Sequence, residues 1–225
     1  MTPGERDPQN VIPKAAAARL SLYLRHLESL RITGAATTSS KDLAKALGVT
    51  AAQVRKDLGY FGQFGFPGIG YKIENLIVEI RKILGTDRIW NVALVGLGNL
   101  GSALFRYRGF VKQGFRITAI FDKNPAVIGR QVGGLLVKHI NELERTVSDA
   151  DISLGIMAVP AESAQDVADC MVRAGISGIF NFAPAVLSLP ANVAYVSIDL
   201  TVQLEQLSFH VKQLKDEMGS EYTDA

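Results

Sequence analysis

The sequence predicts a two-domain α/β protein: a small, mostly helical N-terminal domain, a doubly wound parallel sheet, and one long C-terminal helix. Three observations support this fold class. In the first 85 residues, leucines recur at helical spacing, and a glycine-rich aromatic segment follows the third helical stretch. Beyond residue 86, short apolar segments of strand-forming residues alternate with amphipathic helical ones. After residue 200, apolar residues follow a heptad pattern. We therefore expect domains at residues 1–85 and 86–199 and a C-terminal helix at 200–218.

The composition indicates a cytoplasmic protein with no metal site and no membrane segment. Of the 225 residues, 48% are hydrophobic and 20% are charged, and no apolar run approaches the roughly 18 residues that cross a bilayer. The N-terminus lacks the basic-then-apolar pattern of a signal peptide. With one cysteine and three histidines, an intramolecular disulfide is excluded and a structural metal is not expected.

The charge is distributed unevenly between the two expected domains. Residues 1–85 carry 12 Lys and Arg against 7 Asp and Glu, whereas residues 86–225 carry 12 against 15. A basic N-terminal third beside an acidic remainder favours a nucleic-acid-binding module joined to a domain of another kind.

The N-terminal domain begins with two helices. Pro13 can occupy a first helical turn because its missing N–H is not needed there, and leucines then recur on one face at positions 20, 24, 27 and 30. Ser39 and Asp42 resemble the cap and the first-turn acid of a second helix. Gly48 ends that helix, since glycine adopts the left-handed conformation that helix ends favour.

A third helix follows after a short turn, which gives the helix-turn-helix pattern. Thr50 and Gln53 match a capping box at its start, and an apolar face follows at positions 54, 58 and 61. Gln53 and Arg55 can reach base edges, and Lys56 can reach phosphate. Asp57 is interpreted as an intramolecular partner, because phosphate repels a carboxylate. The positions on this helix expected to contact DNA are Thr50, Ala51, Gln53, Arg55, Lys56 and Tyr60.

Residues 64–71, with the sequence FGFPGIGY, read as a tight hairpin. A hairpin directly after a recognition helix is a wing, so we interpret the domain as a winged helix and add Gly68, Gly70 and Tyr71 to the DNA-contacting set. The alternative is any three-helix domain with a glycine-rich turn. Apolar positions from 73 to 84 then define a connecting helix that ends at Gly85.

A glycine motif marks the start of the second domain. The strand-like run Trp90–Val95 leads into GLGNLG at residues 96–101, followed by a helix from about 102 to 112 and a strand from 115 to 121. In this context the motif is typical of a Rossmann dinucleotide site. Gly96 permits the tight turn, Gly98 lets a pyrophosphate approach the backbone, and Gly101 lets helix and strand pack closely. The helix N-terminus presents unpaired N–H groups to the phosphates.

The residue that closes the second strand selects the dinucleotide. Asp122 would accept hydrogen bonds from the adenosine ribose hydroxyls and repel a 2′-phosphate, which favours NAD(H) over NADP(H). Lys123 beside it weakens that preference. The alternative is a Rossmann-type domain for another nucleotide or for coenzyme A.

The remainder of this domain alternates between strands and helices. We expect strands at 133–137, 152–158, 178–182 and 194–198, with helices at about 141–147 and 161–174. Ligands bind past the carboxyl ends of such strands, although Phe182 fits plain core packing equally well. The expected cofactor-binding set is Gly96, Leu97, Gly98, Asn99, Leu100, Gly101, Asp122, Lys123, Ala158, Val159, Pro160, Asn181 and Phe182.

The last helix carries its apolar residues at alternating spacings of four and three, which suits a partner helix. A helix-turn-helix protein usually needs a dimer to read two half-sites. We therefore interpret this helix as part of a homodimer interface, with packing on the chain's own sheet as the alternative. The seam consists of Leu200, Leu204, Leu207, Val211 and Leu214.

Two functions of different classes fit this organisation. An NAD-dependent oxidoreductase would need an acid or base beside the nicotinamide. His139 has no obvious carboxylate partner, and His26 and His210 lie outside the expected site. Cys170 is interpreted as a buried, inert thiol, and neither a Ser/Tyr/Lys reductase constellation nor a substrate domain is evident. A transcription factor whose DNA affinity depends on a bound dinucleotide accounts for both domains.

The sequence resembles the Rex family of bacterial redox-sensing transcriptional repressors over about residues 10–215. The resemblance rests on VRKDLGYFG at 54–62, GIGY at 68–71, GLGNLG at 96–101, YRGF at 107–110 and SIDL at 197–200. It implies a homodimer with exchanged C-terminal helices. Such a dimer represses respiratory and fermentative genes when NADH is low, and leaves its inverted-repeat operator DNA when NADH rises.

The resemblance also implies a switch built from three residues. The family's Arg on the first helix, Tyr after the glycine loop and Asp before the last helix match Arg19, Tyr107 and Asp199. Tyr107 is expected at the cofactor as well, and Asp199 would bond Arg19 in one state and Tyr107 in the other. One departure is the wing tip, where the family often has a basic residue and this chain has Phe66-Pro67. A minor-groove contact by that side chain is therefore not carried over.

NAD+ and NADH differ chiefly in the nicotinamide, which is cationic in NAD+ and neutral in NADH. An apolar pocket penalises the buried cation, so our hypothesis is that NADH binds more tightly and draws the dimer into a closed state. The winged helices would then no longer match two half-sites one DNA turn apart. A nearly complete switch requires roughly 5 kcal/mol of differential affinity.

Overall fold

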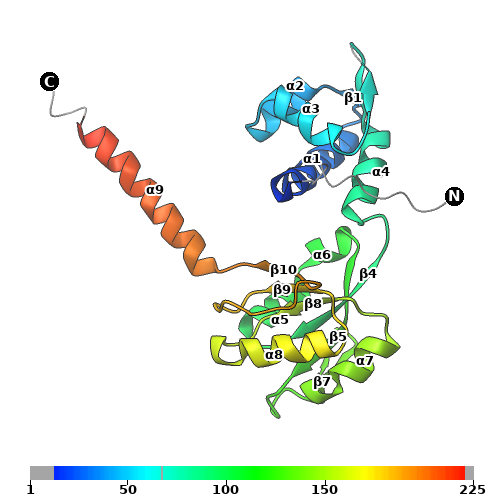
Figure 1. Cartoon of the computed structure of the whole chain (residues 1–225), viewed down its shortest axis with the longest axis vertical. Coiled ribbons are helices and arrows are strands. Elements are labelled where there is room, and N and C mark those ends of the chain that lie inside the picture. The colour runs from blue at the N-terminus through cyan, green and yellow to red at the C-terminus, as the bar shows by residue number, and fades with distance from the viewer. Residues whose placement is uncertain (1–12, 67, 221–225) are drawn as a thin grey trace. The chain divides into compact units, whose positions relative to one another are not determined.

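The computed structural model describes residues 13–66 and 68–220, and the chain separates into two compact units that divide between Arg88 and Ile89. Figure 1 labels most of the helices and strands of both units. Each unit encloses buried apolar clusters of its own. The protein is therefore a mixed α/β chain, which confirms the predicted fold class.

The first unit is a helical domain with a small antiparallel sheet. Its strands pair in the order β1-β3-β2. Buried side chains from all four helices form its core, among them Leu20, Leu43, Val54 and Leu76. The helix-turn-helix followed by a hairpin is a winged helix, as predicted. Its elements are α1 (Lys14–Ile32), β1 (Thr37–Thr38), α2 (Ser40–Leu47), α3 (Ala51–Gly59), β2 (Gly65–Phe66), β3 (Gly70–Lys72) and α4 (Ile73–Leu84).

The ends of these helices have local causes that the sequence predicts. Ser39 Oγ accepts a hydrogen bond from the Asp42 N–H, and Asp42 Oδ2 accepts one from the Ser39 N–H. The donor–acceptor distance is 3.1 Å in both bonds. Gly48 ends α2 in the left-handed conformation, with φ of 67°. Thr50 caps α3 by accepting the Gln53 N–H over 3.1 Å. The predicted capping box is wrong in its second half, because the Gln53 side chain donates to Asp57 instead.

The sequence pattern does not predict β1, which lies in the Thr/Ser-rich stretch at residues 37–40 between the first two helices. Thr37 and Thr38 pair with Lys72 and Tyr71 of β3. A Cβ at Gly70 would collide with the carbonyl oxygen of Thr38, so a glycine is needed for the two strands to approach. A two-residue strand whose partner lies far along the chain leaves no local pattern.

The second unit is a largely parallel sheet with its strands in the order β10-β9-β8-β4-β5-β7-β6. Neighbouring strands run parallel except for β6 with β7. The chain order reverses between β4 and β8, which is where doubly wound sheets bind ligands. The strands are β4 (Trp90–Val95), β5 (Phe115–Asp122), β6 (Gln131–Val132), β7 (Leu135–His139), β8 (Leu154–Met157), β9 (Gly178–Asn181) and β10 (Ala194–Ser197).

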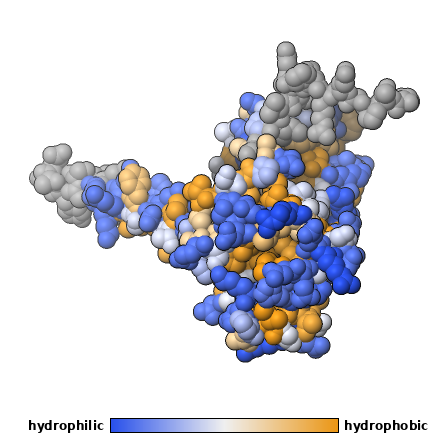
Figure 2. Space-filling model, turned by 60° about the horizontal axis from the view of Figure 1, so that its bottom comes forward, coloured by the Kyte–Doolittle hydropathy of each residue, from blue (hydrophilic) through white to orange (hydrophobic). Residues whose placement is uncertain are grey.

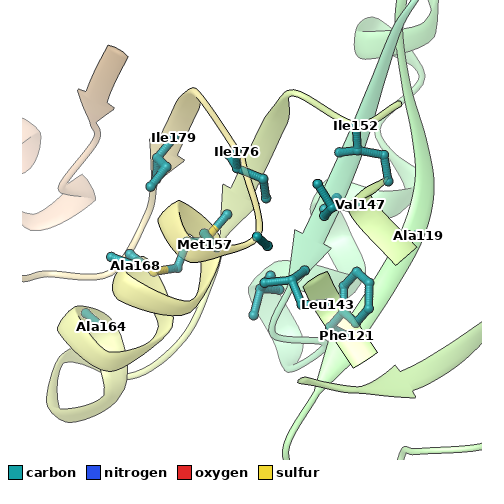
Figure 3. Close-up of a cluster of buried hydrophobic side chains, with 14 of the residues drawn as sticks. Ala119, Phe121, Leu143, Val147, Ile152, Met157, Ala164, Ala168, Ile176 and Ile179 are labelled. Carbon is teal, nitrogen blue, oxygen red and sulfur yellow. The ribbon is translucent and has the colours of Figure 1, made fainter. Parts of the chain in front are cut away.

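Helices cover both faces of this sheet. On one face, Leu143 of α7 and Ala168 of α8 pack with Phe121 and Met157 of the strands (Figure 3). On the other face, the helices after the glycine loop pack on a second cluster that contains Leu94. The sheet is therefore doubly wound, as predicted. The helices are α5 (Asn99–Arg106), α6 (Arg108–Lys112), α7 (Leu143–Asp149), α8 (Ala161–Arg173) and α9 (Leu200–Ser220), with a 3₁₀ turn at Ile140–Glu142.

The structure corrects two expected elements of the second unit. The helix expected at 102–112 starts at Asn99 and is broken into α5 and α6 at Tyr107, whose ψ of 103° is extended. The Tyr107 ring lies edge-on against Phe110, and a Cβ at Gly109 would collide with it. The strand expected at 133–137 is part of a β6–β7 hairpin, because two glycines with positive φ form a turn at 133–134.

Within the described ranges, no helix combines the length and the apolar character required to cross a bilayer. Among the same residues, no three His, Cys, Asp or Glu side chains gather as a metal site would require.

Candidate nucleotide site and nucleic-acid interface

A cavity of about 320 Å³ opens at the carboxyl ends of β4, β5 and β8, at the point where the strand order reverses. The glycine loop forms one wall through Gly96, Leu97 and Gly98. The segment after β5 contributes Asp122 and Lys123, and residues 158–160 after β8 close the other side. The structure thus brings together three segments of the predicted cofactor site: the glycine loop after β4, Asp122 and Lys123 at the end of β5, and residues 158–160 after β8.

The glycines of the loop have separable roles. At Gly96 a Cβ would collide with the carbonyl oxygen of Ala158, and at Gly101 it would collide with the carbonyl oxygen of Gly96. Both glycines are therefore required by close packing. Gly98 has an ordinary φ of −69°, and a Cβ there would meet nothing within 4 Å. Open space beside this backbone, at the start of α5, fits the approach of a pyrophosphate.

The carboxylate of Asp122 ties the two walls of the cavity together. Its Oδ2 accepts a hydrogen bond from the Leu97 N–H over 2.7 Å, and its Oδ1 accepts one from the Asn124 N–H over 2.8 Å. A carboxylate offers about four acceptor positions, so Asp122 can also receive hydroxyl groups of a ribose. Lys123 Nζ donates to Ser163 Oγ of α8 over 2.6 Å, which places a cation at the rim.

Several predicted cofactor residues lie outside the lining of this cavity. Asn99, Leu100 and Gly101 form the first turn of α5. Tyr107 is 58% exposed at the break between α5 and α6. These four residues adjoin the glycine loop in sequence without lining the cavity.

The side chains of Asn181 and Phe182 hold and pack the chain at the carboxyl end of β9. The Asn181 side chain is fully buried: its Oδ1 accepts the Ala183 N–H over 2.8 Å, and its Nδ2 donates to the Ala183 carbonyl oxygen over 3.0 Å. The rings of Phe182 and Phe180 lie 4.4 Å apart within an apolar cluster. Phe182 thus packs in the core of the second unit, and its role at the cofactor stays a prediction.

The first unit exposes the cations of its recognition helix. Arg55 and Lys56 of α3 are exposed, and Tyr60 at its C-terminal end is half-buried. Arg55 Nη1 donates to Ser40 Oγ at the start of α2 over 3.1 Å. This bond directs the guanidinium toward α2, a direction that the sequence does not indicate.

A second cavity, of about 650 Å³, lies where Arg55 meets the hairpin, and we call it the wing groove. The predicted DNA-contacting residues Gly68, Gly70 and Tyr71 line it, and burial raises the pKa of Tyr71. Residue 67, named at the wing tip, lies outside the described residues. Sequence reasoning missed Ser40 and Lys41 of α2 and the N-cap residue Ser39, which also line the groove. A lysine at the start of the helix preceding the recognition helix was the available signal.

Asp57 of α3 is fully buried and accepts hydrogen bonds from three side chains. Arg19 donates to it through Nε over 2.5 Å and Nη2 over 2.8 Å, Tyr23 through its hydroxyl over 2.7 Å, and Gln53 through Nε2 over 2.7 Å. Burial by itself would raise the pKa of Asp57, but the hydrogen bonds from these groups and the charge of Arg19 outweigh it and lower that pKa. The predicted role of Asp57 as an intramolecular partner is confirmed.

The three expected switch residues are distributed over both units. Arg19, on α1 of the first unit, is paired with Asp57. Tyr107 and Asp199 belong to the second unit. Asp199 Oδ1 accepts the Thr201 N–H over 2.8 Å, so it caps α9.

Every described side chain of α9 from residue 200 to residue 216 is exposed in the single chain. Apolar side chains alternate with polar ones along it (Figure 2). The alternative in which the seam packs on the chain's own sheet is therefore not what the structure shows. The seam residues Leu200, Leu204, Leu207, Val211 and Leu214 are 43–67% exposed.

Comparisons with known proteins match both units. The family model described as "Putative DNA-binding protein N-terminus" matches residues 11–59, and the one described as "CoA binding domain" matches residues 87–185. The chain is 50% identical over 202 residues to the redox-sensing transcriptional repressor Rex of Carboxydothermus hydrogenoformans, covering 90% of this chain and 97% of that one.

Two solved structures of RSP are similar over nearly the whole chain. The complex of RSP with β-NAD+ and operator DNA has a TM-score of 0.87 at 37% identity, covering 94% of this chain and 98% of that one. The complex with β-NADH has a TM-score of 0.83 at 35% identity, covering 92% and 99%. RSP is a Rex-family repressor. With half of its residues identical to a Rex repressor over nine-tenths of its length, this chain belongs to the Rex family of redox-sensing transcriptional repressors, as the sequence resemblance predicted.

Proposed function

We propose that this protein is a transcriptional repressor that binds an inverted-repeat operator as a homodimer and leaves the DNA when NADH binds. The observation that carries the proposal is the presence in one chain of two features: the cavity beside Gly98, and a recognition helix with Arg55 and Lys56 exposed. The name of the relative and the ligands in the RSP structures support the same two ligand classes.

The second unit would hold NAD(H). Residues 96–101 and the start of α5 would receive the pyrophosphate, Asp122 the adenosine ribose, and residues 158–160 the far side of the dinucleotide. When bound, the dinucleotide supplies a nicotinamide that is cationic in NAD+ and neutral in NADH. Apolar surroundings disfavour the cation, and this difference is the source of the proposed redox response.

The first unit would read DNA. Gln53 and Arg55 face base edges or the adjoining backbone, Lys56 and the wing groove face phosphates, and Gly70 and Tyr71 shape the wing. Phosphate contacts set the register of the protein on the duplex, whereas base contacts set the sequence it selects. Because the domain acts on DNA, we place the protein in the cytoplasm.

The switch between the two units would use Arg19, Tyr107 and Asp199. Arg19 has five N–H donors and uses Nε and Nη2 for Asp57, so Nη1 remains on the guanidinium for a second carboxylate. We assign that role to Asp199 in one state of the switch and assign Tyr107 as the partner of Asp199 in the other. Asp199 also caps α9. A change of partner from Arg19 to Tyr107 would therefore be coupled to the N-terminal end of the dimerisation helix.

The homodimer would form through α9, whose exposed seam needs an apolar partner. A second copy of the same helix, exchanged between subunits, meets that need.

We propose a regulator rather than an oxidoreductase because the candidate acids are engaged in structure. His139 Nδ1 accepts the Asn141 N–H at the start of the 3₁₀ turn. Cys170 is half-buried on α8, where Arg173 Nη2 lies 3.0 Å from its sulfur.

The proposal is tested by fluorescence anisotropy of a labelled inverted-repeat promoter fragment, titrated with the protein at one fixed salt concentration. Separate titrations contain no ligand, NAD+, NADH or coenzyme A. Tight binding that NADH alone abolishes would support the proposal. Release by coenzyme A would assign the cavity to that ligand instead, and an absence of DNA binding in every titration would contradict the repressor function.

A further inference from the structure

Gln53 occupies the third position of the recognition helix and is half-buried, between the helix core and its DNA-facing side. Its side-chain Nε2 donates a 2.7 Å hydrogen bond to Oδ1 of Asp57, one helical turn further along. The neighbouring cations Arg55 and Lys56 have exposed side chains and take no part in this hydrogen bond. Of these candidate DNA readers, Gln53 is the one whose polar group is attached to a buried residue.

The carboxylate that accepts the bond from Gln53 is buried, and all of its acceptor positions are used. Arg19 donates to both of its oxygens, and the Tyr23 hydroxyl donates to Oδ2. With the bond from Gln53, four hydrogen bonds meet the roughly four acceptor positions of a carboxylate. Because Asp57 and Tyr23 are both 0% exposed, water does not compete for these positions.

The carbonyl oxygen and the NH₂ group of a glutamine side chain are nearly identical in shape, but a buried carboxylate distinguishes between them. An ionised carboxylate only accepts hydrogen bonds, so it binds the NH₂ end of Gln53 and repels the carbonyl end. A half-turn of the amide would place Oε1 against Oδ1 at the 2.7 Å now spanned by the N–H···O bond. The lowered pKa of Asp57 keeps the carboxylate in this acceptor-only form at neutral pH.

We infer, on the basis of the proposed function, that Asp57 is a positioning residue for sequence reading: it fixes the amide of Gln53 so that Oε1 and the second N–H are offered together to an adenine. Adenine presents an N6 amino donor and an N7 acceptor in the major groove, and a glutamine amide matches that pair. One N–H of the Gln53 amide donates to Asp57. The second N–H can then donate to adenine N7, while Oε1 accepts from the N6 amino group. Asp57 itself contacts no base, and it influences which base is selected by orienting Gln53.

The test measures the affinity of the full-length protein for operator duplexes that differ at single base pairs, without NADH and at one salt concentration. The wild type should prefer one A·T pair in each half-site by roughly 5- to 150-fold. Gln53→Met, which keeps the side-chain length, and Asp57→Asn, which removes the acceptor-only partner, should both lose that preference at the same base pair.

Two matched controls separate positioning from general weakening. Lys56→Ala should weaken all duplexes by a common factor, because a phosphate contact carries no sequence information. Tyr23→Phe removes a donor to Oδ2 and leaves the Oδ1 contact with Gln53, so it should keep the A·T preference. If Asp57→Asn folds and retains the full preference that Gln53→Met loses, the inference is wrong.

A second measurement does not depend on whether the Asp57 variant folds. In ¹⁵N-resolved NMR spectra of the wild type, one side-chain amide proton of Gln53 should exchange slowly with solvent, as expected for a bond to a buried carboxylate. Rapid exchange of both protons, as in an exposed glutamine, would overturn the inference. Failure of the wild type to bind any duplex would instead refute the proposed function, and the reading role of Gln53 with it.

Discussion

The phenol of Tyr23 donates a 2.7 Å hydrogen bond to the carboxylate of Asp57, and both side chains are completely buried. Burial, together with this bond and the charge of Asp57, raises the pKa of Tyr23. The same contact helps to lower the pKa of Asp57 against the opposing effect of burial. The bond joins α1 to the recognition helix, so the DNA-reading surface depends on a charge held in the core.

Replacing Tyr23 with Phe should therefore destabilise the first unit without changing its shape. Loss of a hydrogen bond to a charged, buried group costs about 1.5–3 kcal/mol. Hydrogen exchange of the α3 amides at neutral pH measures this loss locally. Tyr60→Phe, the same chemical change at the C-terminal end of α3, should leave exchange unaltered.

The cost of Tyr23→Phe should depend on pH. The folded pKa of Asp57 lies below its unfolded value of about 3.9, so the stabilisation is complete above that pH and is lost as the pH falls through the folded pKa. The difference between the wild type and Tyr23→Phe should narrow on acidification. A difference that stays constant as the pH falls through the folded pKa of Asp57 would show that the carboxylate charge plays no part.

Alanine at two glycines of the loop should have opposite consequences. At Gly98 a Cβ would enter open space, so Gly98→Ala should keep the fold and weaken NADH binding at least about tenfold by obstructing the pyrophosphate. At Gly101 it would collide with the Gly96 carbonyl, so Gly101→Ala should lower the thermal stability of the second unit. Fluorescence titration with NADH and calorimetry separate the two effects. An unchanged NADH affinity in Gly98→Ala would show that the backbone at Gly98 does not contact the cofactor.

The wing groove should act on the DNA backbone. Lys41→Ala and Arg55→Ala should each weaken binding to all operator variants by a similar factor and reduce the magnitude of the salt-dependence slope by about 1. The measurement is operator affinity at several salt concentrations. If Arg55→Ala instead relaxes selection at one base pair, Arg55 reads a base, as its position on α3 alone suggests, and its contact with Ser40 is not kept on DNA.

A charge in the α9 seam should prevent the homodimer. Leu207 is 57% exposed in the single chain, and Leu207→Glu would place a carboxylate in the apolar seam between partner helices. Sedimentation equilibrium should show monomers for Leu207→Glu and dimers for the control Gln206→Glu, which lies beside the seam. A dimer of unchanged affinity in Leu207→Glu would place the interface elsewhere.

Features with a local cause could be predicted from the sequence. The strand Trp90–Val95 is observed with the predicted bounds, because a short apolar run leads straight into a glycine turn. The capping box at Ser39 and the glycine at the end of α2 follow from the chemistry of a few adjacent residues. The packing role of Gly101 follows from the need of α5 to approach the loop.

Features that depend on partners far along the chain could not be predicted in this way. The bond from Arg19 to Asp57 joins residues on different helices, so no local pattern indicates it. The break at Tyr107 depends on how its ring packs against Gly109 and Phe110. Asn181 lies at the strand end where ligands bind, yet its amide holds the following loop.

The central claim is that NADH and operator DNA oppose one another through a single protein equilibrium. Such coupling is reciprocal: if NADH weakens DNA binding by some factor, DNA must weaken NADH binding by the same factor. The direct test is the NADH dissociation constant of the full-length protein, measured by fluorescence alone and again with saturating operator duplex, with a scrambled duplex as control. We predict that the operator raises this constant by the factor by which NADH lowers operator affinity, and that the scrambled duplex leaves it unchanged. An equal NADH dissociation constant with and without operator would contradict the account.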